Sequence, residues 1–383
     1  MSPLEWSFAR GREAVAALGP EWRELELEHG DDQQMFQTHA FTEAFTRSAT
    51  PEANARLRVL VGREAGRTVL VWPLIRRRRG PFVVLEQVGG LLAPYDDVLV
   101  CRDGAERERV SAALDFLATR SGVASIHLRG LREHAVAAGP LASRFGAPVG
   151  ATLAPFVPTE RFADGDAYLA SLDKWTRKDL RRSIRLLESI GPLRHVVREA
   201  GAEVPLLLDQ LFHWKAQWLR ARGLDGRAVM SDAGRRHVTE FARLAGCGGE
   251  PRTRVSALYA GDRLVAVGLG FEYRGRHYEY LDAFDAELHR CGAGRVRLLE
   301  GIRDAIERRV RVYDLMTPAT EFKELWTAEG QRVFAHALGE GVLGRVFANT
   351  YLRVARPWLK KAYNAVVVPM RRRMVRVATH SGW

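Results

Sequence analysis

The pattern that best suits a chemical task is a short glycine-bearing loop, His289–Gly294, followed by an amphipathic stretch, Arg295–Arg309. Glycines let a backbone approach a ligand closely, and the first N–H groups of a helix lack partners within it and attract negative charge. Nearby cations would add charge-assisted hydrogen bonds: Arg290, Arg295 and Arg297. The spacing predicts a phosphate site at the start of a helix, with an ordinary turn and helix cap as the alternative.

This loop needs strands on both sides to hold it. Two apolar runs joined by a glycine-containing turn, Val255–Tyr259 and Leu264–Phe271, predict an antiparallel hairpin. His277–Phe284 predicts a third strand, and Val310–Met316 predicts a fourth strand after the helix. A phosphate site of this kind therefore lies between a three-stranded meander and a following helix and strand.

The same order of elements occurs earlier in the chain. Strands are predicted over 57–63, 68–75 and 82–88, followed by a helix over 105–120 and a strand over 125–128. Such repetition is typical of a duplicated domain, and chance similarity of two hairpins is the alternative. The first copy has Leu92–Asp97 where a phosphate loop would be expected, and its two acids would repel phosphate. We therefore expect this loop to shape the acceptor side of a cleft.

The start, Met1–Gly30, is predicted to be irregular, with one helix around Glu21–Glu28.

Meander, glycine loop, helix and strand together resemble the core of the GNAT acyltransferases. Their loop usually has Gln or Arg, then Gly-x-Gly/Ala; here His289-x-x-Gly292-x-Gly294 has His in first place. The segments Tyr313–Met316 and Glu321–Trp326 resemble the ending found in CelD-type acetyltransferases, which are relatives of the Fem aminoacyltransferases. Phe322 stands where that branch usually has Tyr. The basic segment Arg177–Gly191 is similar to a signature of both groups.

The resemblance implies an α+β fold with tandem GNAT-like domains, each a mostly antiparallel sheet flanked by helices. It implies a degenerate N-terminal domain (1–160), a connector with a basic helix (161–200), a C-terminal GNAT domain (201–340) and a basic tail (341–383). It also implies that acetyl-CoA, or another acyl-CoA, binds to the end of the third strand and to the loop: Leu281, Ala283, Phe284, Arg290, Gly292, Ala293, Gly294, Arg295 and Arg297.

Acyl transfer from a thioester requires a positioned carbonyl, removal of a proton and stabilisation of an oxyanion. The candidates for these tasks are Asp282, Glu279, Tyr280 and Lys323. Strict alternation would put Tyr280 and Asp282 on one face of the strand and Glu279 on the other. Asp282 is the first choice as general base because it lies nearest the loop. Lys323 would grip a phosphate of the acceptor or fix its own loop. Ordinary surface carboxylates are the alternative for both acids.

Composition limits the remaining possibilities. The 383 residues carry a net charge of +12, which suits a phosphorylated or acidic partner. The three cysteines form no Cys-x-x-Cys pair, so neither a disulfide framework nor a metal site is expected. No stretch reaches the roughly 18–20 apolar residues of a spanning helix. We expect a soluble, cytoplasmic protein, whose basic tail either contacts an anionic membrane surface or packs as a terminal helix.

The sequence therefore predicts a CoA-dependent GNAT acyltransferase that acetylates an amine or hydroxyl of a sugar, polysaccharide or cell-envelope precursor. One alternative is a Fem-type transferase that takes its acyl group from aminoacyl-tRNA. Another is a non-catalytic basic adaptor for anionic polymer or membrane. No DNA partner is expected. The prediction requires an accessible helix start near Gly292 and strands that separate in front of it.

Overall fold

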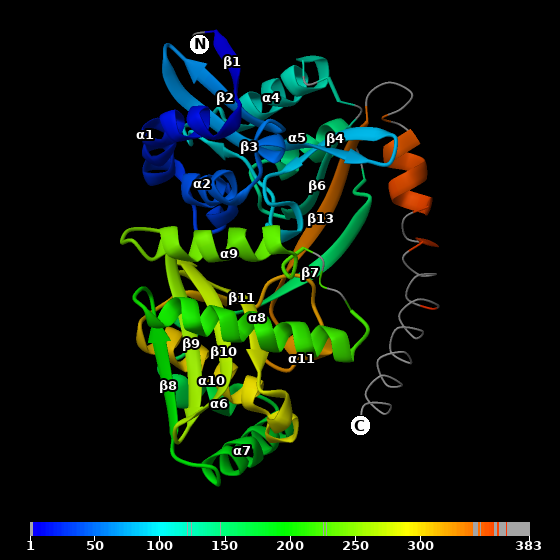
Figure 1. Cartoon of the computed structure of the whole chain (residues 1–383). Helices are drawn as coiled ribbons and strands as arrows, with labels where there is room; N and C mark the ends of the chain where they lie inside the picture. Colours follow the sequence, from blue (N-terminus) through cyan, green and yellow to red (C-terminus); the bar gives the residue numbers. More distant parts are fainter. Residues whose placement is uncertain are drawn as a thin grey trace. The chain divides into compact units, whose positions relative to one another are not determined.

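Figure 1 shows the computed structural model of the protein. The structure describes residues 3–120, 122–123, 125–145, 147–224, 226, 228–339, 344, 346–355, 358–359 and 365. Backbone contacts divide the chain into two compact units. The N-terminal unit comprises residues 1–152, 236–241 and 332–362, and the C-terminal unit comprises 153–235, 242–331 and 363–383.

The N-terminal unit is built on a sheet in the order β1-β2-β3-β4-β6-β13, with β5 paired to β3. The strands are β1 (Leu4–Ala9), β2 (Leu57–Glu64), β3 (Arg67–Arg79), β4 (Phe82–Gln87), β5 (Leu99–Val100), β6 (Ser125–Arg132) and β13 (Gly330–Gly339). The helices are α1 (Gly11–His29), η1 (Met35–Gln37), α2 (His39–Ser48), α3 (Pro51–Asn54), η2 (Gly90–Leu92), α4 (Glu106–Arg120), α5 (Ala138–Phe145) and η5 (Val346–Ala355).

Two apolar layers hold this unit together, one on each face of its sheet. Alternate residues of β3 separate the layers: Leu70, Trp72 and Leu74 pack with α4, whereas Val69 and Val71 pack with α1. Because successive side chains of a strand point to opposite faces, a strand with apolar residues at every position must be covered on both sides. The continuous apolar run of β3 therefore requires helices on both faces.

The C-terminal unit has a second sheet, in the order β7-β12-β11-β10-β9-β8. Its strands are β7 (Gly150–Val157), β8 (Leu193–Arg198), β9 (Arg252–Ala260), β10 (Arg263–Tyr273), β11 (Arg276–Phe284) and β12 (Val312–Asp314). Its helices are η3 (Thr159–Arg161), α6 (Gly165–Ser171), α7 (Lys174–Glu188), α8 (Glu203–Ala221), η4 (Ala286–Cys291), α10 (Ala293–Glu307) and α11 (Glu321–Glu324). Helix α9 (Asp232–Ala245) contributes residues to both units.

The predicted α+β class and the predicted repeat are confirmed. In each unit three consecutive strands pair antiparallel, a helix follows, and the next strand lies parallel to the third. The strands are β2, β3, β4 and β6 in one unit and β9, β10, β11 and β12 in the other. A parallel neighbour requires a crossover connection, and α4 and α10 each lie within one.

The basic helix is also confirmed. Helix α7 begins after Asp173, whose carboxylate accepts the N–H groups of Trp175 and Thr176. Its predicted stripe is buried at Leu180 and Leu187, while most of its cations are exposed. This amphipathic division agrees with a helix that packs one face and exposes a charged one.

The prediction of an irregular N-terminus is wrong. Residues 4–9 form an edge strand and residues 11–29 form one helix, although Gly19 and Pro20 lie inside it. The alternation Leu4-x-Trp6-x-Phe8 was the available signal for β1, since Trp6 and Phe8 pack against Phe116.

Most of the predicted basic tail, 341–383, lies outside the described residues. The described stretch 346–355 packs through Phe347 and Leu352 against Val84 of β4. None of the helices described is both long and apolar enough to cross a bilayer.

Candidate functional site

The parallel strands β11 and β12 separate along their length. They pair only where Arg276–Tyr278 lie beside Val312–Asp314. Strand β11 continues to Phe284, whereas β12 ends at Asp314. Within the described part of the C-terminal unit, no strand pairs with this edge of β11 beyond Tyr278. Residues 281–284 on that edge therefore have no strand partner there, and a ligand can pair with them except at the Asp282 backbone oxygen, which accepts from Lys215.

A β-bulge lies at the point of separation. Glu279 is opposite Gly270 and Leu281 is opposite Leu269, so Tyr280 is the extra residue. Asp282 is opposite Gly268, where an added Cβ would be 2.2 Å from Nη1 of Arg297 on α10. Residues directly opposite in an antiparallel pair share a face, so Asp282 and Glu279 both face α10. The prediction that Tyr280 and Asp282 share a face is wrong because strict alternation ignores the bulge.

The glycine turn that follows β11 is closely packed. A short 3₁₀ segment, η4, replaces the irregular loop that was predicted, and Gly292 with φ +68° begins α10. An added Cβ at Gly292 would lie 2.4 Å from Oγ of Ser183 on α7. At Gly294 it would lie 3.1 Å from the Phe284 ring. Ala293 and Gly294 occupy the first turn of α10, where N–H groups lack partners within the helix.

The three predicted phosphate-binding cations have different surroundings. Arg290 is exposed beside the turn. Arg295 forms an ion pair with Asp179 of α7. Arg297 is buried and donates to Ser256 Oγ at 2.9 Å and to Glu279 Oε1 at 2.5 Å. Of the three, Arg290 is therefore the best placed to contact an anion in solution, and Arg297 takes part in the interior of the unit.

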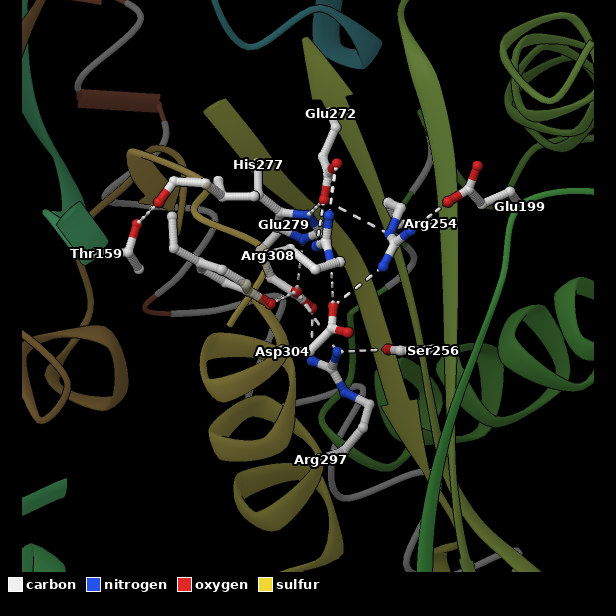
Figure 2. Close-up of polar contacts among 12 residues, drawn as sticks. Thr159, Glu199, Arg254, Ser256, Glu272, His277, Glu279, Arg297, Asp304 and Arg308 are labelled. Carbon is white, nitrogen blue, oxygen red and sulfur yellow. Dashed lines mark hydrogen bonds and ion pairs between the residues drawn. The ribbon is translucent and has the colours of Figure 1, made fainter. Parts of the chain in front are cut away.

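Glu279 lies in a buried polar cluster between the sheet and α10 (Figure 2). Besides Arg297, the hydroxyl of Tyr313 donates to this carboxylate, and Nε2 of His277 lies 3.6 Å from it. The His277 ring stacks on Tyr313, with ring centroids 4.3 Å apart. A carboxylate with this many partners is fixed in place.

The cluster continues through a second acid, Glu272. This carboxylate accepts from Arg308 Nη1 at 2.8 Å and lies 3.6 Å from Nδ1 of His277. Arg254 and Arg308 both reach Asp304, at 3.1 and 2.9 Å. The arginines and His277 face a similar number of carboxylates, so the cluster is close to charge balance: Arg254, Arg297, Arg308 and His277 against Glu199, Glu272, Glu279 and Asp304.

Proton affinities in the cluster are shifted accordingly. Burial alone would raise the pKa of Glu279, but the charge of Arg297 and the interaction with His277 outweigh it and lower the pKa to about 2. Burial alone would lower the pKa of His277, but Glu272 and Glu279 raise it. Glu279 is therefore an ionised structural partner with low proton affinity, and His277 is favoured as the imidazolium.

Asp282 has a different environment. Its side chain is 48% exposed, and Nζ of Lys215 lies 3.6 Å from Oδ1 and donates to the backbone oxygen at 2.9 Å. Lys215 belongs to α8, 67 residues earlier in the chain, so no local sequence pattern connects the two. The structure thus adds Lys215 to the residues near the predicted site.

The residues of the segment Tyr313–Trp326 hold the loop after β12. Asp314 is buried, accepts the N–H of Met316 at 2.8 Å and faces Arg276 at 3.3 Å. Lys323 donates to the backbone oxygens of Met316 and Pro318 at 2.8 and 3.1 Å. Burial lowers the pKa of Lys323. These contacts fix the backbone of the loop at residues 316–318, where the chain leaves the end of β12.

Comparison with known proteins agrees with this geometry. Residues 174–324 match the model of the family described as the acetyltransferase (GNAT) domain. The crystal structure of FemX is similar, with 12% identity, 86% of this chain and 97% of that chain covered, and a TM-score of 0.57. A conserved protein of unknown function from Bacteroides thetaiotaomicron is also similar, with 10% identity, 88% and 99% covered, and a TM-score of 0.50. No match was found among curated proteins.

At these identities the two structures establish the fold alone, whereas the family match locates the domain on the sequence. The matched range contains the meander β9–β11, the turn at Gly292, helix α10 and the separated strand β12. Residues 174–324 are therefore similar to the GNAT acetyltransferase domain, within a chain whose two units have the tandem-GNAT-like fold that matches FemX.

Proposed function

We propose that the protein is a GNAT acyltransferase that moves an acetyl group from acetyl-CoA to an amine or hydroxyl of a sugar, polysaccharide or cell-envelope precursor. The observation that carries the proposal is the edge of β11 beyond Tyr278, which no described strand of this unit covers, followed directly by the glycine turn of α10. Strand edge and helix start together offer backbone N–H groups to a carbonyl and to a diphosphate.

The residues of this chain divide into three roles. The backbone of residues 281–284 would hold the donor and orient its carbonyl, while Ala293, Gly294 and Arg290 would bind its diphosphate. Acyl-CoA, when bound, supplies the acyl group as a thioester. Lys215 and Lys323 would hold the acceptor side of β11 through their contacts with Asp282 and the 316–318 loop.

Asp282 is proposed as the general base. The net reaction forms an N–C or O–C bond to the acyl carbon and breaks its C–S bond, and the acceptor's proton ends on the thiol. Asp282 is half exposed on the separated part of β11 and can accept that proton. Glu279 is excluded from this role in the proposal because its carboxylate is buried and bound to Arg297.

Asp282→Asn should lower kcat by about 100-fold or more, because general base catalysis typically contributes that much. Glu287→Gln is the matched control, since Glu287 is 80% exposed and pairs with Arg263 outside the strand edge. Steady-state assays that follow thiol release measure both. Equal rates for Asp282→Asn and the wild type would refute the assignment of the base.

Gly294→Asp tests the donor site. A carboxylate in the first turn favours the helix itself but repels a diphosphate, so acetyl-CoA affinity should fall. The new Cβ would lie 3.1 Å from the Phe284 ring, so that ring must shift, and thermal melts verify that the variant folds. Gly261→Asp, at a β-turn glycine with φ +60°, controls for the added charge. Calorimetric titration with acetyl-CoA should show binding to the wild type and to Gly261→Asp only. Unchanged affinity in Gly294→Asp would remove the donor assignment.

A second function is favoured by the surface of α7. Lys174, Lys178, Arg181, Arg182 and Arg185 are exposed along it, and Trp175 is 74% exposed. A basic stripe with an aromatic ring suits a polyanion such as aminoacyl-tRNA, the donor of Fem-type transfer. Competition between acetyl-CoA and tRNA distinguishes the two donors. If Arg181→Gln and Arg182→Gln lose tRNA binding but keep acetyl-CoA binding, α7 binds a polyanion at a site separate from the acetyl-CoA site.

A further inference from the structure

The N-terminal unit contains a polar cluster in which positive charge is in excess. Glu86 of β4 is 1% exposed and accepts from Arg79 at 2.8 and 2.6 Å and from Arg129 at 2.8 Å. Arg77 lies beside the same carboxylate, with Nε 3.7 Å from Oε2. Three guanidinium groups thus share one buried carboxylate.

Among the described residues, the neighbouring groups do not neutralise this excess. His127 faces Glu86 at 3.8 Å, and the carboxylate of Asp96 accepts the backbone N–H groups of Arg129 and Gly130. Even with Asp96 counted as ionised, three arginines face two carboxylates. This differs from the cluster around Glu279, where acids and cations are matched.

Of the three guanidinium groups, that of Arg77 has the weakest contact with Glu86. Its only ion pair among the described residues is the 3.7 Å contact with Glu86, which is too long for a hydrogen bond, and its Nε is buried without a hydrogen-bond partner. Burial lowers its pKa, Glu86 raises it, and the charges of Arg79 and Arg129 lower it again. Arg77 therefore carries a positive charge that the described carboxylates balance only weakly, and it can bind a further anion.

The glycine at position 90 leaves room for such an anion. Gly90 has φ +58°, and an added Cβ would lie 3.5 Å from Nη2 of Arg129 and 3.7 Å from Nη2 of Arg77. Both guanidinium groups therefore converge on the place that any other side chain would fill. Their side chains are 35% and 19% exposed, and Leu91 next to Gly90 is 65% exposed, so solvent reaches this place.

We propose that Arg77 and Arg129 bind a phosphate group against Gly90. The planar guanidinium matches two phosphate oxygens, and charge-assisted hydrogen bonds of this type are stronger than neutral ones. A phosphate dianion supplies the charge and the acceptors that Glu86 alone does not. The site goes beyond the proposed acyl transfer, because every residue in it belongs to the N-terminal unit.

Calorimetric titration of the full chain with inorganic phosphate, at constant ionic strength set with sodium chloride, tests the site. The wild type should bind, and Gly90→Asp should bind at least about tenfold more weakly, since its own carboxylate would occupy the place of the ligand. Gly80→Asp is the matched control: Gly80 has φ +61° and open space around its Cα, so phosphate binding should be unchanged. Thermal melts without phosphate verify that both variants fold.

A second pair of variants removes charge in place of adding it. Arg77→Gln should weaken phosphate binding about tenfold, because it removes one of the two guanidinium groups that bind the phosphate. The fold should persist, because Arg79 and Arg129 still bind Glu86. Arg78→Gln removes one charge from the same strand, but its side chain is exposed and contacts Gly80, so binding should persist. Equal losses in both variants, or no loss in Arg77→Gln and Gly90→Asp, would overturn the proposal.

The source of the phosphate is distinguished by the probe. Binding of UDP-glucose at least about tenfold tighter than inorganic phosphate, lost in Gly90→Asp, would indicate a phosphate carried by a sugar-nucleotide substrate. Equal binding of both probes would indicate free phosphate. Binding of both probes that Gly90→Asp leaves intact would place them elsewhere and overturn the site. Failure of the acetyl-CoA assignment would not affect this result, because Gly294→Asp tests a different unit.

Discussion

The third strand of each meander has a parallel neighbour, but the two pairs end differently. In the C-terminal unit β11 runs six residues past its last pairing with β12, and no described strand of that unit covers the gap. In the N-terminal unit β4 pairs with β6 only at Val84 and Leu85, and β6 continues to Arg132. There the loop that contains Asp96 lies in the gap between β4 and β6, since Asp96 forms a β-bridge with Leu131 of β6.

The loop that fills this gap is held from within. Asp96 accepts the N–H groups of Arg129 and Gly130, and Asp97 accepts those of Val136 and Ala137. Both carboxyl groups are buried. Both acids thus satisfy backbone N–H groups inside the unit, which the sequence did not predict, and the role of this loop beside an acceptor stays a prediction.

The comparison shows how one connectivity gives two outcomes. A pair of separated strands exposes backbone groups, and these must be satisfied either by the chain or by a ligand. In the first unit Asp96 satisfies those at Arg129 and Gly130 of β6. In the second unit Asp314 and Lys323 fix the loop that follows β12, and no described strand of that unit pairs with the edge of β11 beyond Tyr278.

The largest expected effect concerns the buried pair that supports β11. Glu279→Gln should lower the free energy of unfolding by about 3–5 kcal/mol near pH 7, because Arg297 is left buried without its partner. The Glu279 pKa is lowered from 4.5 to about 2, so its contribution is present above pH 4.5 and is lost as the pH falls toward 2. Urea unfolding of wild type and variant should therefore converge in acid. A difference independent of pH would contradict the ion-pair explanation.

A smaller effect on the free energy of unfolding, with the opposite pH dependence, is expected for Asp96 in the N-terminal unit. Burial raises the Asp96 pKa from 3.8 to about 6, so its protonated form is favoured in the fold. That contribution is complete below pH 3.8 and is lost as the pH rises through 6, by about 3 kcal/mol at about 1.4 kcal/mol per pKa unit. Asp96→Asn should flatten this part of the stability profile measured by urea unfolding. An unchanged slope would show that Asp96 is ionised in the fold without cost.

The smallest effect tests the filling loop directly. Gly130→Ala should cost about 1–3 kcal/mol, because its Cβ would lie 2.1 Å from the backbone oxygen of Pro94 and push the loop off β6. Gly139→Ala on α5 is the control, since nothing lies within 4 Å of its added Cβ. Hydrogen exchange should become faster at residues 94–97 in the first variant only. Equal stability of Gly130→Ala and the wild type would mean that the loop is held loosely.

Much of the fold could be predicted because its signals are local. The strands 57–63 and 68–75 appear as β2 and β3, and the helices predicted over 105–120 and 295–309 appear as α4 and α10, with bounds shifted by a few residues. Period-two and period-3.6 patterns follow from strand and helix geometry, so they survive in a single sequence. Strand β1 was missed although the alternation Leu4-x-Trp6-x-Phe8 was present, because six residues are a short signal for a strand.

The sequence predicted where in the chain the candidate site lies, but not which residues contact one another in it. The glycines and the order of elements placed it at β11 and α10, where the structure has separated strands and a helix start. Which cation faces which acid was not predictable. Arg297 and Glu279 are 18 residues apart and meet because the sheet packs on α10, and Arg295 meets Asp179, 116 residues away.

The sequence by itself determined the element types, the repeat and the position of the glycine turn, because each depends on residues a few positions apart. Only the tertiary structure decided that a bulge at Tyr280 puts Asp282 on the face of Glu279, that Glu279 is bound to Arg297, and that the first gap is filled by Asp96 while the second is not. The reason is physical: strand register, burial and ion pairing depend on distant segments meeting, and their energies exist only after packing.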